Sequence, residues 1–339
     1  MQRITRDDVA RLAGTSTAVV SYVINEGPRP VAADTRERVL AAIEELGYRP
    51  NLVARALRSM SSRTIGMVVP DSSAAFFTEL VHAVERAAYE RGSLVLLGNS
   101  GFSRTNERRY VESLAGMQVD GLLLVRAEVN EPRARTTGDE RFGVPVVYLN
   151  HRGPRGVEAT SVLLANERGG GMATEHLIAH GYRRIGCLTG TARSGPVAER
   201  ARGCAKALQT AELTGAGGTG SAVLRTGLDR HSTRAEVRDW LATPERPDAI
   251  VATADSLAFD ALSAAHELGL RVPGDLAVVG FGGTEAAAHT WPTLTTVGHP
   301  FDHFGATAVS MLELVQRHGR QPDQVLDVQL IARRSCGCP

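Results

Sequence analysis

Short apolar runs alternate with longer amphipathic segments from residue 64 onward. Eight runs, rich in valine, leucine and isoleucine, fall into two groups of four, at 65–70, 94–100, 121–127 and 144–150, then 184–190, 222–227, 248–255 and 276–283. Between them apolar residues recur at helical spacing, near 76–91, 104–117, 168–180, 197–211, 233–241 and 256–268. Strands that alternate with helices form parallel sheets covered on both faces. The pattern predicts an α/β core of two similar, doubly wound parallel-sheet lobes, closed by a last helix over about 301–317 and a last strand over about 325–332.

The first 25 residues have a different pattern, that of two short helices joined by a tight turn. Thr5 is expected to cap the first helix, with Asp8 as its capping-box partner. Gly14 is expected to end that helix in the left-handed conformation, and Ser16 to cap a second helix that runs to about residue 24. Residues 5–25 therefore predict a helix-turn-helix, the start of an all-α N-terminal head.

A third helix is predicted over about 34–46, ended by Gly47. Leu12 on the first helix and Leu40 on the third are expected to face inward. The second helix leaves small and hydroxyl-bearing side chains outside, at Thr17, Ala18, Ser21 and Tyr22. Any small helical bundle could have this pattern, but the N-terminal position, the glycine turn and the hydroxyl-rich outer face favour DNA binding.

Residues 50–63 join the head to the core. Pro50 and Asn51 are expected to start a short helix through about Arg58, followed by a serine-rich linker. A helix of two turns with few apolar residues is marginal in water. We therefore expect this helix to be ordered only when a partner holds it.

Length and charge limit the class of protein further. The 339 residues suffice for two or three domains, and a hydrophobic content of 43% supplies sizeable cores. The net charge is only +1, but residues 1–63 hold ten arginines against seven acidic residues, a modest excess of the sign that binds nucleic acid. The chain shows no secretory signal and no apolar run of the roughly 18 residues that cross a membrane. We expect a cytoplasmic protein with no membrane partner.

No catalytic constellation is apparent, so we expect neither an enzyme nor a bound cofactor. Residues 190–197 begin like a phosphate-binding loop but lack its lysine and hydroxyl residue. The ten histidines show no metal-ligand spacing, and we expect no metal. Cys336 and Cys338 could have a metal or redox role, but reduced thiols on a loose tail are the favoured interpretation.

Three aspartates, Asp71, Asp120 and Asp255, lie near predicted strand ends. Open parallel sheets bind ligands beside the ends of their strands. Nothing in their spacing indicates paired acid and base chemistry, so we expect polar contacts to a ligand.

Several segments together resemble one family along nearly the whole chain: DVARLAGTSTAVVSYVIN, TRERVLAAIEELGYRPN, RTIGMVVPD, ATEHLIAHGYRRIGCLTG, RPDAIVATADSLA and GLRVPGDLAVVGF. The chain is similar to the LacI/GalR family of bacterial transcription regulators. The resemblance implies a DNA-binding head at 1–49, a hinge at 50–63 and a periplasmic-binding-protein-like core at 64–339. It puts lobe one at about 64–162 and 294–322, and lobe two at about 163–291 and 323–336. The chain would cross twice between lobes, with the last helix in lobe one and the last strand in lobe two.

The resemblance also implies partners and a mode of action. A homodimer would bind palindromic, double-stranded operator DNA, and a small-molecule effector between the lobes would change the DNA affinity. Most members repress transcription. Activation stays open, because the position of the operator relative to the promoter decides whether binding represses or activates. A solute-binding protein or an enzyme built on the same core remains the alternative.

The same resemblance assigns DNA contacts residue by residue. Base edges would be reached from Thr17, Ala18 and Tyr22, and phosphates or register would be fixed by Thr5, Ser16, Ser21 and Asn25. On the hinge helix the assigned residues are Asn51, Ala54 and Leu57, of which Leu57 would enter the minor groove as a wedge. A buried contact against the core is the alternative for Leu57.

Tyr22 departs from the family pattern, in which most relatives have arginine. Arginine grips guanine through two hydrogen bonds, and tyrosine cannot. We expect an operator half-site that differs at the base this residue faces.

Effector contacts are assigned with the same resemblance to Phe76, Asn150, Arg200, Asp255 and Phe301. Arg200 and Asp255 could instead pair with each other across the cleft. Other positions depart from the family: Ala74–Ala75 replace a common Asn-Pro, as in some purine-binding relatives, Gly282 replaces an acidic residue, and Leu228 replaces an aromatic wall. A sugar site normally offers an aromatic face and several paired polar groups, and we expect fewer of both here. The effector is therefore a sugar, a sugar derivative or a purine-like molecule, with no effector as a further alternative.

Overall fold

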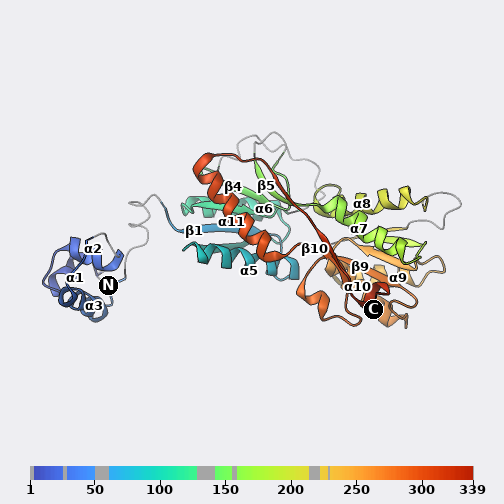
Figure 1. Cartoon of the computed structure of the whole chain (residues 1–339), viewed down its shortest axis with the longest axis horizontal. Coiled ribbons are helices and arrows are strands. Elements are labelled where there is room, and N and C mark those ends of the chain that lie inside the picture. The colour runs from blue at the N-terminus through green and yellow to red at the C-terminus, as the bar shows by residue number, and fades with distance from the viewer. Residues whose placement is uncertain are drawn as a thin grey trace. The chain divides into compact units, whose positions relative to one another are not determined.

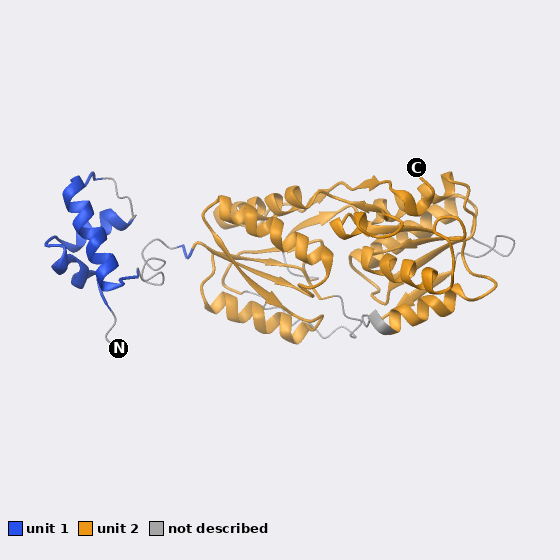
Figure 2. Ribbon diagram, turned by 90° about the horizontal axis from the view of Figure 1, so that it is seen from below, with its two compact units in different colours: residues 1–62 blue, residues 63–339 orange. Residues whose placement is uncertain are grey.

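The computed structural model describes residues 4–25, 29–49, 61–127, 142–154, 159–213, 222–227 and 230–338. The chain divides into two compact units, Met1–Ser62 and Arg63–Pro339, shown in blue and orange in Figure 2. Each unit has its own apolar core, and each is described by itself.

The first unit is a helical head of α1 (Arg6–Leu12), α2 (Thr17–Asn25) and α3 (Ala33–Leu46). The predicted capping box is confirmed, because the Thr5 N–H donates to Asp8 Oδ2 at 2.9 Å and the Asp8 N–H donates to Thr5 Oγ1. Gly14 has the left-handed φ of 61° that the turn requires. The Val19 N–H donates to Ser16 Oγ at 3.4 Å, so Ser16 caps α2 as predicted.

The head buries one stripe of each helix, and Val9, Val20 and Val39 are fully buried at its centre. The prediction that Leu12 and Leu40 face inward is wrong, since they are 46% and 48% exposed. Each lies about 100° around its helix from the centre of the buried stripe, so an apolar residue type alone did not place it in the core.

The second unit contains two six-stranded sheets of matching strand order (Figure 1). Sheet A is wholly parallel, in the order β2 (Leu94–Asn99), β1 (Thr64–Val69), β3 (Gly121–Leu124), β4 (Val146–Leu149), β5 (Thr160–Leu164) and β11 (Gln324–Leu326). Sheet B follows the same plan, in the order β7 (Val223–Thr226), β6 (Ile185–Gly190), β8 (Ala249–Ala252), β9 (Ala277–Gly282), β10 (Thr295–Gly298) and β12 (Gln329–Ile331). Only β12 runs antiparallel to its neighbour among the described pairs. The predicted pair of doubly wound parallel sheets is confirmed.

Helices cover both faces of each sheet. In lobe one, α5 (Ala75–Glu90) and α11 (Phe301–His318) pack together on one face, and α6 (Arg104–Gly116) covers the other. Strand alternation explains this, because Met67 packs on the α5 side while Val68 packs on the α6 side. In lobe two the pairs are α7 (Asn166–Ala179) with α8 (Pro196–Thr210), and α9 (Arg230–Leu241) with α10 (Asp255–Glu267).

Three features of the lobes differ from the prediction. Strands β5 and β10 are additional to the eight predicted runs, and β10 belongs to sheet B although residues 294–322 were expected in lobe one. The predicted last strand is split into β11 in sheet A and β12 in sheet B, so the chain crosses between lobes three times within the described residues. The sequence pattern did not predict β10, because this strand begins with two polar residues, Thr295 and Thr296. Their buried hydroxyls bond to Cys336 and Asp255.

Within the described ranges, no helix is both long enough and apolar enough to cross a lipid bilayer.

Candidate functional site

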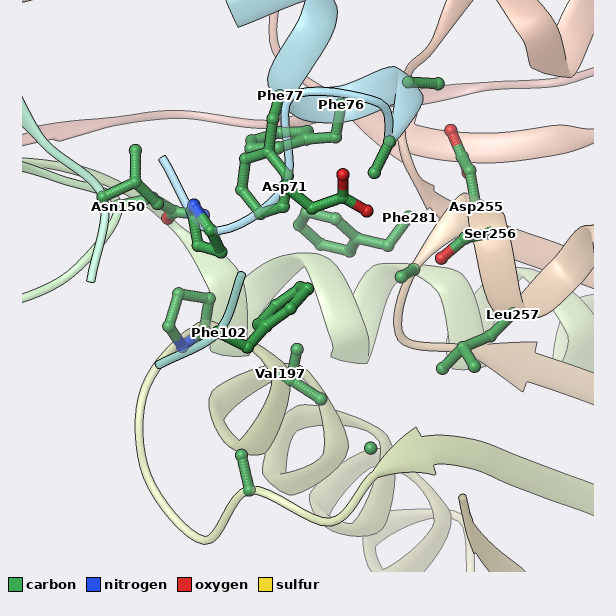
Figure 3. Close-up of a pocket in the computed structure, with 18 of the residues that line it drawn as sticks. Asp71, Phe76, Phe77, Phe102, Asn150, Val197, Asp255, Ser256, Leu257 and Phe281 are labelled. Carbon is green, nitrogen blue, oxygen red and sulfur yellow. The ribbon is translucent and has the colours of Figure 1, made fainter. Parts of the chain in front are cut away.

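A cavity of about 410 Å³ lies between the two lobes of the core. Its walls come from the segments that follow β1 and β4 in lobe one and β6 and β8 in lobe two. Ligands of doubly wound sheets bind at this carboxyl edge of the strands. Figure 3 shows side chains of α5 and of the start of α10 turned toward this common space.

Arg200, on α8, is buried and lines the cavity. Its Nε donates to Asn166 Oδ1 at 2.9 Å, and its Nη1 donates to the Thr253 carbonyl at 2.8 Å. The guanidinium carbon lies 3.8 Å from the centre of the Phe281 ring, a cation–π contact. These contacts fix the direction of Arg200 before any ligand arrives.

Asp255, the first residue of α10, lines the cavity from the same lobe as Arg200 and is only 3% exposed. Its Oδ1 accepts the Thr296 hydroxyl at 2.5 Å, and its Oδ2 accepts the N–H and hydroxyl of Thr284 at 3.0 and 2.8 Å. Burial raises the pKa of Asp255, while these hydrogen bonds and the charge of Arg200 oppose the rise. The two residues therefore interact electrostatically within lobe two, and not across the cleft between the lobes.

The glycines of β9 explain one departure from the family pattern. A Cβ on Gly282 would lie 2.8 Å from Asp255 Oδ2, and one on Gly280 would lie 2.4 Å from Asp255 Oδ1. An acidic side chain at residue 282 would therefore meet the Asp255 carboxylate.

Asn150 lines the cavity at the end of β4, in the left-handed conformation with a φ of 55°. Its Oδ1 accepts the Asn166 amide at 2.9 Å and the Leu164 N–H at 3.3 Å. Asn166 in turn holds Arg200, so a continuous polar chain joins lobe one to the cavity wall of lobe two. This chain follows the first crossover between the lobes.

The two predicted aromatic contacts have different positions. Phe76 lines the cavity from the first turn of α5, beside Phe77. Phe301 is not among the residues that line it, but packs edge-on against Phe76 with ring centres 5.4 Å apart. In the structure Phe301 supports a wall residue.

The cavity is richer in aromatic side chains than the sequence indicated, and that expectation is wrong. Five phenylalanines line it: Phe76, Phe77, Phe102, Phe259 and Phe281. Phe281 is the last residue but one of β9 and Phe102 follows β2, so their places near strand ends were the signal that could have identified them. Leu228, the residue considered for an aromatic wall, lies outside the described residues.

The other two aspartates near strand ends lie at opposite edges of sheet A. Asp71 follows β1 and lines the cavity, where its Oδ1 accepts the N–H and hydroxyl of Ser73 at 2.9 and 2.7 Å. Asp120 precedes β3 and accepts the Arg63 N–H at 2.9 Å, so it lies at the amino edge of sheet A. Asp120 is therefore not a cleft residue, since strand ends in a sequence pattern do not distinguish the two edges.

A carboxylate of lobe one touches lobe two beside the cleft. Glu79 on α5 accepts the backbone N–H of Glu285, in η1 (Glu285–Ala288), at 2.9 Å. Burial raises the pKa of Glu79, the hydrogen bond opposes the rise, and the carboxylates of Glu285 and Asp255 add to it. A raised pKa in the folded protein means that ionisation of Glu79 destabilises the folded core, although the hydrogen bond to Glu285 itself favours the ionised form.

Replacing Glu79 by glutamine is therefore expected to stabilise the core at neutral pH. The amide keeps an acceptor for Glu285 and removes the charge, with a gain below about 1 kcal/mol because the site is partly solvated. The favourable contribution of protonated Glu79 is complete below its usual pKa of 4.5 and is lost as the pH rises through the raised value. The advantage of Glu79→Gln, measured by urea unfolding, should disappear on acidification to pH 4. An advantage that is unchanged at pH 4, or a destabilised variant at pH 7.5, would contradict this.

The predicted DNA-binding residues of the head lie around α2. Thr17 and Ala18 are exposed on its first turn, and Ser21 and Tyr22 are half-buried on the next. Thr5 and Ser16 are exposed at the starts of α1 and α2. Four of these six residues therefore lie on α2, Ser16 caps α2, and Thr5 caps α1. The first turn of α2 contains no acidic residue that would repel phosphate.

Four predicted DNA contacts cannot be placed in the same way. Asn25 is the last residue of α2, but its side chain is outside the description. Asn51, Ala54 and Leu57 lie outside the described residues.

Known protein families match parts of both units. Residues 5–51 match bacterial regulatory proteins of the lacI family, and residues 174–336 match a periplasmic binding protein-like domain. The transcriptional repressor PurR of Aliivibrio salmonicida is 34% identical over 98% of both chains, and that of an Escherichia coli strain is 35% identical over 98% of this chain and 96% of its own.

Solved structures agree with this assignment. The lac repressor dimer bound to operator and the anti-inducer ONPF has 28% identity and a TM-score of 0.81, covering 99% of each chain. The regulator CelR in complex with cellobiose has 31% identity and a TM-score of 0.70, covering 98% of this chain and all of its own. The named relatives are transcriptional repressors and not enzymes. The chain belongs to the lacI family of bacterial regulatory proteins.

Proposed function

We propose that the chain is a transcriptional repressor that binds a palindromic operator as a homodimer, with an affinity set by a small molecule in the cleft. The observation that carries this is one chain holding both an exposed helix-turn-helix surface and a ligand-sized cavity between two lobes. The lac repressor match, a dimer on its operator, supports the assembly. Arginine-rich heads gain affinity by displacing counterions from phosphates.

A solute-binding protein or an enzyme would use the same core but has no role for the head. Selection of bound fragments from genomic DNA by the full-length protein distinguishes a repressor from these two alternatives. A repressor enriches a small set of palindromic sites, and removal of residues 1–49 abolishes the enrichment. Equal retention of genomic and random duplex at low salt would refute the proposal.

We infer that the effector is a planar, polar heterocycle such as a purine base. Five phenylalanine rings border a cavity of about 410 Å³, and flat ligands stack favourably on aromatic faces. Arg200 and Asp255 supply a donor and an acceptor from the lobe-two side of the cavity. Ala74–Ala75 at the start of α5, a pairing shared with some purine-binding relatives, supports the same class.

Thermal unfolding with hypoxanthine, guanine and adenine, against glucose and cellobiose, tests this inference. A purine should raise the melting temperature of the core and change operator affinity, whereas the sugars should do neither. Stabilisation by a sugar alone would overturn the purine class but leave the repressor intact.

Tyr22→Arg is expected to change operator choice. An arginine at this exposed edge of α2 can donate two hydrogen bonds to guanine, which tyrosine cannot, with about 1–3 kcal/mol of discrimination at that base pair. Selection from a randomised half-site library should show guanine enriched at one position for the variant. Arg11→Lys, on the neighbouring helix, should leave the preferred sequence unchanged. An identical preferred site for Tyr22→Arg and wild type would contradict the assignment.

A further inference from the structure

Two histidines and two cysteines meet at the far end of α7 in lobe two. His176 lies in the last turn of α7 and His180 directly follows it, while Cys336 ends η2 (Arg334–Cys336) and Cys338 follows two residues later. Their ligand atoms all lie within 4.8 Å of one another. Cys336 is fully buried and Cys338 is partly buried, so the expectation of a loose tail is wrong.

Three of the six separations between the ligand atoms are close to those of a tetrahedral zinc site. His176 Nε2 lies 3.2 Å from Cys336 Sγ and 3.6 Å from Cys338 Sγ, and His180 Nε2 lies 3.3 Å from Cys338 Sγ. Zinc bonded to sulfur and nitrogen at its usual lengths sets tetrahedral edges of roughly 3.3–3.8 Å. The three nitrogen–sulfur distances thus fit one shared ion, and all four atoms lie within 4.8 Å of one another.

Local structure explains why the side chains converge. Residues four apart lie on the same face of a helix, and the rings of His176 and His180 have centres 4.3 Å apart. Gly337 has a left-handed φ of 98°. This turn, which glycine adopts without strain, lets the two flanking cysteines approach the same pair of rings.

Neighbouring groups orient the ligands as metal sites require. His180 Nδ1 donates to the His176 carbonyl at 2.9 Å, which leaves its Nε2 with a lone pair toward Cys338. Thr295 Oγ1 accepts the Arg333 N–H at 2.8 Å and lies within hydrogen-bonding distance of Cys336 Sγ, at 3.0 Å. These contacts hold Cys336 in place beside the two rings.

We propose that His176, His180, Cys336 and Cys338 bind one Zn²⁺ ion and so fasten the last strand and turn of the chain to α7. Binding forms two Zn–S and two Zn–N bonds and releases two thiol protons to solvent. The ion is structural, because all four positions are protein ligands and none is open to substrate. Thr295 also links the site to β10, whose next residue, Thr296, holds Asp255 in the cleft.

Metal analysis of untagged, full-length protein tests the proposal. Wild type should contain one zinc per chain, and Cys338→Ser or His180→Gln, both at the accessible edge of the cluster, should lower zinc affinity at least about 100-fold. The matched control His318→Gln, at the end of α11 in lobe one, should keep full zinc. Replacement by Co²⁺ should give the intense visible bands of four-coordinate cobalt and a near-ultraviolet thiolate charge-transfer band, weakened in Cys338→Ser.

Competing chemistries give different results. Zinc far below one per chain, unchanged by the substitutions, would overturn the proposal. So would a Cys336–Cys338 disulfide in protein purified under reducing conditions, or a six-coordinate cobalt spectrum without the thiolate band. Chelator treatment supplies a further readout, since it should lower the melting temperature of wild type and the control but leave Cys338→Ser unchanged.

Discussion

Replacement of Gly203 by alanine is expected to destabilise lobe two by about 3 kcal/mol or more. A Cβ on Gly203 would lie 1.9 Å from the Glu167 carbonyl oxygen and 2.8 Å from the Gly171 nitrogen. Both are backbone atoms of α7, so no side chain can move aside. Alanine gains up to about 1 kcal/mol over glycine inside a helix, which is too little to offset the separation of two packed helices. The same change would displace Arg200, one turn earlier on α8.

Gly171→Ala is the matched control for this prediction. Gly171 faces the same helix crossing, but a Cβ there would meet only the Gly203 carbonyl, at 3.7 Å, an ordinary contact. It should therefore leave stability unchanged or raise it slightly through helix propensity. Urea unfolding of the two variants beside wild type gives the comparison. Equal midpoints for Gly203→Ala and Gly171→Ala would show that α7 and α8 do not depend on close backbone approach.

Local chemistry explains why the head could be predicted well from sequence. Thr5, Gly14, Ser16 and Gly47 act through hydrogen bonds or dihedral angles within a few residues, and the structure has all four as expected. The alternation of strands and helices likewise fixed the layer order of each lobe. These features depend on separations that a sequence pattern states directly.

Features that depend on long-range packing could not be predicted in the same way. Strand β10 begins with two threonines and lacks the apolar run by which strands were predicted, and the partners of these threonines lie about 40 residues away in either direction. Asp71 and Asp120 have similar sequence contexts but lie at opposite edges of sheet A. The His176–Cys336 contact joins residues 160 apart, so histidine spacing alone gave no sign of it.

Asn166→Ala is expected to weaken the coupling between a ligand in the cleft and the segment that crosses between the lobes. The Asn166 side chain accepts from Arg200 and donates to Asn150, and it is 2% exposed. Its loss leaves the Arg200 Nε–H without this acceptor in a buried place, at about 1–3 kcal/mol. Ligand in the cleft would then no longer bias the crossover. Coupling between two binding sites typically changes affinity roughly 5–150-fold. In Asn166→Ala the ligand should lose most of its effect on operator affinity.

The measurement is operator affinity with and without the ligand that stabilises the core most in the thermal screen. Coupling is reciprocal, so operator DNA must lose its effect on ligand affinity by the same factor in Asn166→Ala. Operator affinity without ligand should stay close to wild type, because the substitution lies in the core and not in the head. Gln316→Ala, which removes a side-chain bond to the Asp120 carbonyl at the amino edge of sheet A, should keep the full response. An Asn166→Ala protein that binds ligand and still responds like wild type would place the coupling outside the Arg200–Asn166–Asn150 chain, at contacts such as that between Glu79 and Glu285.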